Sequence, residues 1–171
     1  KTFLPAYDYV KQCFSIIKNL GMKCYAAFDT FAAGNGKKPH PDMPGIKKDG
    51  FACEVYGLDA DGKPVIRKQS AADHLHTVGS IDDFGEIFLN PGNEEVQAYV
   101  LALLKEFVDT YHPDGIVLDR VRYVGLSTDF SEQSRKKWEA YSGISDERWP
   151  EDMYTIVQTK NGYQEKPGRY F

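Results

Sequence analysis

Two aspartates occupy positions at which a carboxylate could do chemistry. Asp29 directly follows the apolar run of residues 22–28, and Asp119 follows the apolar run of residues 116–118. Both runs indicate buried strands, and residues just past the carboxyl ends of parallel strands face the crevice where ligands bind. A carboxylate in such a crevice can act as a nucleophile or stabilise a cation. The structural alternative for each aspartate is a turn former or a helix cap.

The residues after Asp119 favour a role beyond capping. No helix is predicted to start within the next ten residues, so Asp119 is not an ordinary cap. If the strand continues, Tyr123 shares a face with Asp119, while Arg120 and Arg122 point to the other face. A nearby guanidinium favours the charged form of a carboxylate, which suits a nucleophile or a group that stabilises a cation. A structural ion pair is the alternative for both arginines.

Two helix–loop–strand units are expected to position these aspartates. Apolar residues at helical spacing predict a helix from Tyr7 to Leu20 and a second one over residues 93–111. Each predicted helix leads through a short loop into one of the two apolar strands, an order typical of α/β proteins with parallel strands. A third helix is expected at residues 131–141 with Ser131 as its N-cap, and the pattern weakens after Ile144.

Residues 30–85 are expected to form a long βα loop between the two helix–loop–strand units, and connections of this length often carry function. Two short apolar stretches at residues 51–58 and 63–68 flank the turn sequence Asp-Ala-Asp-Gly, which predicts a β-hairpin. His74 and His76 have the spacing of two metal ligands on a strand, but no third ligand is evident. We therefore expect no metal and no cofactor.

Composition narrows the possible partners. The 171 residues include 21 basic and 25 acidic side chains, and the net charge of -4 argues against nucleic acid as the main partner. No apolar run approaches the ~18 residues of a membrane span. The three cysteines exclude a fully paired disulfide framework, and Cys13 and Cys24 are expected to be buried packing residues. Aromatic residues make up 13% of the chain, which suits a carbohydrate-binding cleft, although most of these rings are expected in the core.

The segment from Phe88 to Tyr123 resembles the signature of the glycosyl-hydrolase-like 10 family of bacterial proteins. The family pattern is an extended stretch ending in Asn-Pro-Gly, a helix, and then Asp-Gly-Ile-x-x-Asp-x-x-x-Tyr. Here these motifs are Asn90-Pro91-Gly92 and the stretch from Asp114 through Asp119 to Tyr123. The resemblance covers most of residues 1–143, and the two motifs at this spacing are more specific than either one alone.

The resemblance implies a glycoside hydrolase built on a (β/α)8 barrel and acting on a polysaccharide or oligosaccharide. Asp119 is then the carboxylate nucleophile or stabiliser, and Asp29 is the best candidate for the second carboxylate. The candidate substrate-binding residues are Tyr123, Arg120, Arg122 and Asn90. Two alternatives remain open, namely a non-catalytic carbohydrate-binding module and an inactive fragment of a larger enzyme.

The length predicts a single domain, residues 1–171, that is an incomplete barrel. A complete (β/α)8 barrel usually takes ~250 residues. The open edges of a partial sheet favour self-association. The chain starts at Lys1 and shows no signal-peptide pattern, which suggests that a natural N-terminus and its targeting segment have been removed. An extracellular or periplasmic bacterial protein is the expectation.

Overall fold

The computed structural model describes residues 7–35, 40–69, 86–145 and 147–170. The chain divides into two compact units. Unit 1 comprises residues 1–30 and 98–121, and unit 2 comprises residues 31–97 and 122–171. The candidate histidines His74 and His76 lie outside the described residues.

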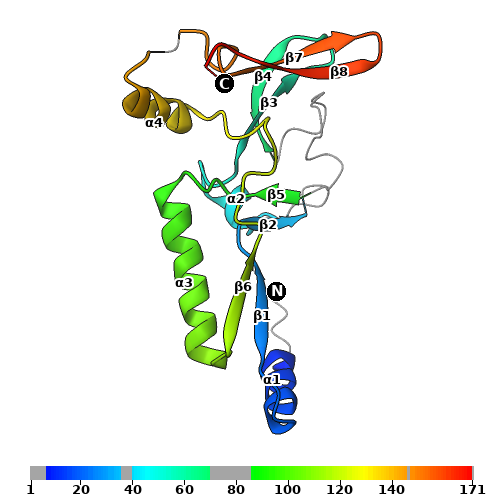
Figure 1. The fold of residues 1–171 in the computed structure, drawn as a ribbon, viewed down its shortest axis with the longest axis vertical. Coiled ribbons are helices and arrows are strands. Elements are labelled where there is room, and N and C mark those ends of the chain that lie inside the picture. Colours follow the sequence, from blue (N-terminus) through cyan, green and yellow to red (C-terminus); the bar gives the residue numbers. More distant parts are fainter. Residues whose placement is uncertain (1–6, 36–39, 70–85, 146, 171) are drawn as a thin grey trace. The chain divides into compact units, whose positions relative to one another are not determined.

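Unit 1 is built around a parallel pair of strands (Figure 1). Its elements are α1 (Tyr9–Asn19), β1 (Tyr25–Asp29), most of α3 (Glu94–Tyr111) and β6 (Gly115–Asp119). β1 pairs with β6 in parallel register, from Tyr25 opposite Gly115 to Asp29 opposite Asp119. The prediction of two parallel strands, each preceded by a helix, is confirmed.

The amino ends of β1 and β6 are tied together by two reciprocal hydrogen bonds. The Cys24 N–H donates to the Asp114 carboxylate at 2.7 Å, and the Asp114 N–H donates to the Cys24 carbonyl at 2.8 Å. The next pair in the register leaves no room for a side chain on Gly115, because a Cβ there would lie 2.5 Å from the Tyr25 ring. The Asp-Gly step that opens the family-like motif therefore sets the register of the two strands.

The two helices of unit 1 contact each other through aromatic rings. Phe14 of α1 packs edge-on against Phe107 and Tyr111 of α3, with ring centroids 6.1 and 6.0 Å apart. Cys24 is buried as expected, whereas the prediction that Cys13 is buried was wrong, because Cys13 is exposed on α1. The apolar stripe of α1 is only partly covered, and none of its residues is fully buried.

Unit 2 consists of short antiparallel pairs and two further helices. Its elements are β2 (Ala32–Asn35), α2 (Pro44–Lys47), β3 (Glu54–Leu58), β4 (Pro64–Lys68), β5 (Glu86–Phe88), α4 (Glu132–Ser142), β7 (Tyr154–Thr159) and β8 (Gly162–Pro167). The strands pair as β2–β5, β3–β4 and β7–β8. The β3–β4 hairpin and the N-cap of α4 at Ser131 confirm the sequence predictions. The β2 strand and the β7–β8 hairpin were not predicted.

The described residues form a mixed α/β structure with small two-stranded sheets, and they do not close a barrel. The α/β prediction is confirmed at this level. A barrel needs eight parallel strands that each pair with two neighbours. Here only β1 and β6 are parallel, and tight turns such as Asp59–Gly62 direct the chain of unit 2 into antiparallel pairs instead. None of the described helices has the length and apolar character needed to cross a membrane.

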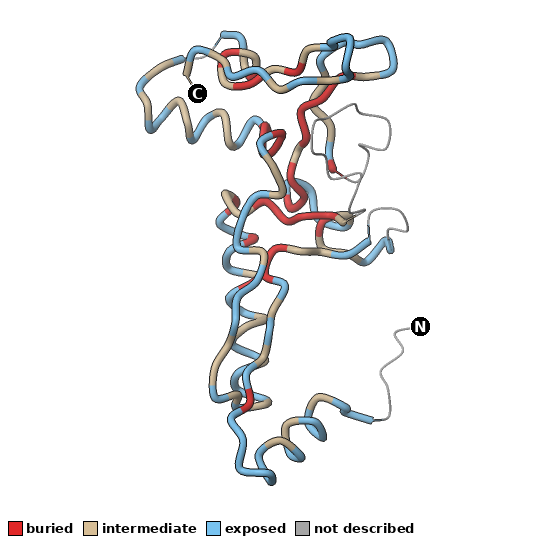
Figure 2. The backbone as a smooth tube through the Cα atoms, turned by 45° about the vertical axis from the view of Figure 1, so that its right-hand side comes forward, coloured by how far each residue is buried: buried red, intermediate tan, exposed pale blue. Residues whose placement is uncertain are grey.

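Most of the described buried residues belong to unit 2 (Figure 2). One cluster joins the β3–β4 hairpin, the segment before α4 and the β7–β8 hairpin, and its buried members are Tyr56, Leu58, Phe130, Tyr154 and Ile156. Phe130 lies at its centre, with ring contacts to Tyr56, Trp149 and Tyr154. The cluster therefore holds together segments that are far apart in the sequence.

Replacing Phe130 tests how much this cluster contributes to the stability of unit 2. Phe130 is 7% exposed, so Phe130→Ala should lower the free energy of unfolding by about 3–5 kcal/mol through lost burial and an unfilled cavity. Tyr141→Ala is the matched control, because Tyr141 is 93% exposed and its loss should cost less than about 0.5 kcal/mol. Urea unfolding measures both. Equal effects would show that the cluster does not stabilise the unit.

Candidate functional site

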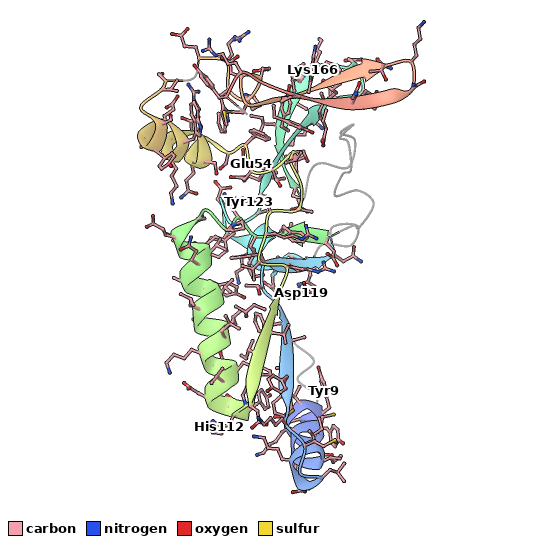
Figure 3. All side chains as sticks on the ribbon, viewed as in Figure 1. Tyr9, Glu54, His112, Asp119, Tyr123 and Lys166 are labelled. Atoms are coloured by element: carbon pink, nitrogen blue, oxygen red, sulfur yellow. The ribbon has the colours of Figure 1, made fainter. Side chains whose placement is uncertain are left out.

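The two candidate catalytic aspartates meet at the carboxyl end of the parallel pair. Asp29 is the last residue of β1, Asp119 is the last residue of β6, and the two are direct partners in the register. Residues paired across parallel strands send their side chains to the same face, about one strand spacing of ~4.8 Å apart. Figure 3 labels Asp119 at the tip of β6. Both aspartates are exposed, so the pair is open to a ligand on unit 1.

Arg120 contacts both carboxylates. Its backbone N–H donates to Asp119 Oδ1 at 2.7 Å, and its side-chain Nε lies 3.5 Å from Asp29 Oδ1. The guanidinium of Arg120 therefore pairs with Asp29, and its backbone bonds to the neighbouring Asp119. Arg120 also has a φ of +55°, a conformation that few side chains adopt and that often occurs at functional sites.

β6 ends at Asp119, and the left-handed conformation of Arg120 turns the chain, so the condition for a longer strand is not met. Asp119 and Tyr123 therefore do not share a strand face. Arg122 donates through Nη1 to the carbonyls of Tyr123 and Val124, both at 3.1 Å, and its guanidinium lies 5.8 Å from the Phe88 ring centroid. Arg122, Tyr123 and Asn90 belong to unit 2, whereas the Asp29–Asp119–Arg120 cluster belongs to unit 1.

Asn90 belongs to a buried hydrogen-bond network in unit 2 that the sequence did not predict. It is 1% exposed, and both of its side-chain polar atoms bond to the protein. Its Nδ2 donates to Asp129 Oδ2 at 2.6 Å, and its Oδ1 accepts from the Gly92 N–H at 2.8 Å. These bonds close the Asn-Pro-Gly turn, so the motif that resembles the family signature fixes a backbone turn.

Asp129 is the hub of this polar network. Its Oδ1 accepts from the Glu54 N–H at 2.6 Å. Its Oδ2 accepts from Asn90 and from two hydroxyls at the start of α4, Ser131 at 2.5 Å and Ser134 at 2.6 Å. A 9% exposed carboxylate with these donors joins β3, the Asn-Pro-Gly turn and α4. The sequence analysis missed Asp129, although its position two residues before the Ser131 cap was a local signal.

Three groups near Asp129 have raised pKa values. Burial, and then the negative charge of Asp129, raise the pKa of the Cys53 thiol and of the Glu54 carboxyl. The same two causes in the same order raise the pKa of the Tyr123 hydroxyl. These three groups stay protonated to a higher pH than usual, so Tyr123 and Cys53 are poor nucleophiles at neutral pH.

Metal-ligating side chains do not cluster in the part of the chain that the structure describes. Two open hollows are present there. One, of about 350 Å³, is lined by Phe28 of β1 and by Leu103, Glu106, Phe107, Thr110 and Tyr111 of α3. The other, of about 430 Å³, lies in unit 2 and is lined by Asp49, Gly50, Asn93, Glu94, Glu95 and Gln133. Asp49, Glu94 and Glu95 each pair with a lysine, which gives this second hollow balanced charges.

Comparison with known proteins gives one named relative. The chain is 30% identical over 163 residues to an S-layer-related protein of Niallia circulans. The match covers 90% of this chain but only 9% of the relative, so the chain spans a small part of that protein's length. No family model and no solved structure matches the chain. The resemblance to the glycosyl-hydrolase-like 10 family therefore stays a prediction.

Removing the charge of the hub should destabilise unit 2. In Asp129→Asn, an NH₂ group replaces one of the two oxygens that accept hydrogen bonds. Each buried donor that faces this group loses its acceptor, which lowers the free energy of unfolding by about 1–3 kcal/mol. We expect the free energy of unfolding to fall by about 2–4 kcal/mol. Asp119→Asn is the matched control, because the exposed Asp119 should change stability by less than about 1 kcal/mol.

Chemical denaturation of Asp129→Asn and Asp119→Asn measures the change in the free energy of unfolding of each variant. If Asp129→Asn unfolds at the same denaturant concentration as the parent chain, the network around Asp129 is not a structural hub.

Proposed function

We propose that the chain contributes a catalytic segment to a glycoside hydrolase, with Asp29 and Asp119 as its carboxylate pair. The observation that carries the proposal is the register of β1 and β6, which makes these two residues direct partners at the carboxyl end of a parallel strand pair. Glycoside hydrolysis needs two carboxyl groups on either side of the scissile bond. The sequence offered only one confident carboxylate, and the register supplies a partner for it.

The position of the pair supports an enzyme more than a structural role. Asp129 is buried among its donors, whereas Asp29 and Asp119 are exposed and can be reached by a substrate. Arg120 holds both of them from one side in an uncommon backbone conformation. Strain of this kind persists where the surrounding structure holds a functional geometry in place.

A (β/α)8 barrel is the architecture that we propose for the complete enzyme. The parallel β1–β6 pair, with a helix before each strand, is a building unit of such a barrel, and barrel enzymes place their catalytic residues at the carboxyl ends of strands. Further strands would pair with the outer edges of β1 and β6. The antiparallel pairs of unit 2 would then belong to the long loops that such barrels carry between their strands.

An oligosaccharide or polysaccharide is the proposed substrate, and a cell-surface setting is the proposed location. The similarity to a protein named for the S-layer supports this location. The motif from Asn90 to Tyr123, which resembles the glycosyl-hydrolase-like 10 family, supports the substrate class.

The proposal is tested on the complete enzyme that contains this segment, by hydrolysis of a panel of polysaccharides followed through the release of reducing ends. Asp29→Asn and Asp119→Asn should each lower the rate by roughly 10²–10⁴-fold, because each removes a group that transfers a proton or stabilises the reacting carbon. Asp109→Asn on α3 is the control, since Asp109 is exposed and pairs only with Lys105 among the contacts described.

Full activity in either Asp29→Asn or Asp119→Asn would remove that residue from the chemistry. Binding of a polysaccharide without hydrolysis by the parent chain would favour a carbohydrate-binding module instead.

A further inference from the structure

The outer edge of β1 is the edge that faces away from β6. Among the described residues, β1 pairs with β6 alone (Figure 1). The Cys24 carbonyl accepts a bond from the β6 side at 2.8 Å, and the Thr30 N–H donates one to it at 2.9 Å. Backbone groups alternate between the two edges of a strand, so those of the odd-numbered residues Tyr25, Ala27 and Asp29 point outward and are placed to pair with another strand.

Unit 1 has few buried apolar residues to stabilise this pair of strands. Of the apolar residues that the structure describes there, only Cys24 and Val100 are buried. Leu20, Met22 and Tyr25, which lie at or just before the start of β1, are exposed. A two-stranded sheet is stabilised by additional strands, and the open edge of unit 1 offers a place for one.

β1 lacks the features that protect an edge strand from pairing. Charged residues and prolines discourage the addition of a further strand. Residues 24–28 contain neither, whereas β8 ends in the sequence Glu-Lys-Pro. Charges occur only at the two ends of the β1 segment, Lys23 before it and Asp29 at its last position.

This arrangement of residues is complementary to itself. Two copies that meet through the same edge are related by a two-fold axis, so their β1 strands are antiparallel. Outward-facing residues must then lie opposite outward-facing residues, which places the axis at residue 25, 26 or 27. Of these registers, only the one centred on Ala26 sets Lys23 of each copy opposite Asp29 of the other. The same register places the large Tyr25 beside the small Ala27.

We infer that a second copy of this chain binds along the outer edge of β1, in the antiparallel register centred on Ala26. Opposite charges that face each other across two strands stabilise the pairing, and like charges destabilise it. Lys23 of the second copy then lies beside Asp29, which also pairs with Arg120 of its own chain. The inference does not rest on the proposed function. A further strand of a complete barrel would need the same edge, so that strand and a second copy exclude each other.

Cysteine cross-linking of the 171-residue chain tests the dimer and its register together. The background is Cys13→Ser, which removes the exposed thiol. Ala26→Cys places two thiols at the two-fold axis, in a non-hydrogen-bonded pair whose Cα atoms lie ~4.5 Å apart, within the usual range of a disulfide. We expect mild oxidation to give a covalent dimer that reductant separates.

Ala27→Cys is the matched control. In the inferred register, residue 27 lies opposite Tyr25 of the second copy, and the two residues 27 are offset along the strands beyond the ~7 Å limit for a disulfide. This variant should stay unlinked. Linkage through Ala27→Cys but not through Ala26→Cys would overturn the register.

Analytical ultracentrifugation gives a readout without cysteines. The parent chain should show a concentration-dependent dimer, and Lys23→Asp should raise its dissociation constant roughly 10-fold or more, because two attractive pairs become repulsive. Lys11→Asp on α1 is the charge-matched control and should leave the dissociation constant unchanged, since Lys11 lies outside the β1 segment. A parent chain that is monomeric throughout, or a dimer that Lys23→Asp does not weaken, would overturn the inference. Hydrolysis by the complete enzyme does not depend on either result, so the proposed function would survive.

Discussion

The register of β1 against β6 is the constraint on which the candidate site depends. It is set at the amino ends of the strands, where Cys24 and Asp114 exchange two hydrogen bonds and the ring of Tyr25 covers Gly115. Four residues further along, the same register makes Asp29 and Asp119 partners. Because side chains alternate along a strand, a slip of one residue would turn one carboxylate to the opposite face. The chemistry at one end of the pair thus depends on backbone contacts at the other.

The two units contain carboxylates of different kinds, buried in unit 2 and exposed in unit 1. Asp129 of unit 2 is buried and saturated with donors, and it organises the Asn-Pro-Gly turn and the start of α4. Asp29 and Asp119 of unit 1 are exposed, and both contact Arg120. The signature-like motif therefore contains both kinds of residue, since Asn90 belongs to the structural network and Asp119 to the proposed chemistry.

Local signals predicted the helices and the parallel pair well, because apolar periodicity and capping residues act over a few neighbouring positions. The helix at residues 94–111 and the cap at Ser131 are examples. The β7–β8 hairpin was missed because polar residues fill half of the positions of its two strands, and β8 begins with glycine and ends with proline. The importance of Asp129 could not be foreseen, since its donors Asn90 and Glu54 lie 39 and 75 residues away in sequence. The ion pair of Arg120 with Asp29 was not predicted for a similar reason, since the two residues lie far apart in the sequence.

The most direct measurement is disulfide closure between positions 29 and 119, the two candidate catalytic positions. In a chain with Cys13→Ser, we predict that Asp29→Cys with Asp119→Cys forms a disulfide under mild oxidation, because a separation of ~4.8 Å lies within the usual Cα range of ~4.4–6.8 Å. The control pair, Asp29→Cys with Leu118→Cys, places the second thiol on the opposite face of β6 and should stay reduced. Mass spectrometry of peptides prepared without reduction detects the disulfide in each of the two double-cysteine variants. Closure of the control pair without closure of the first would contradict the register and, with it, the proposed carboxylate pair.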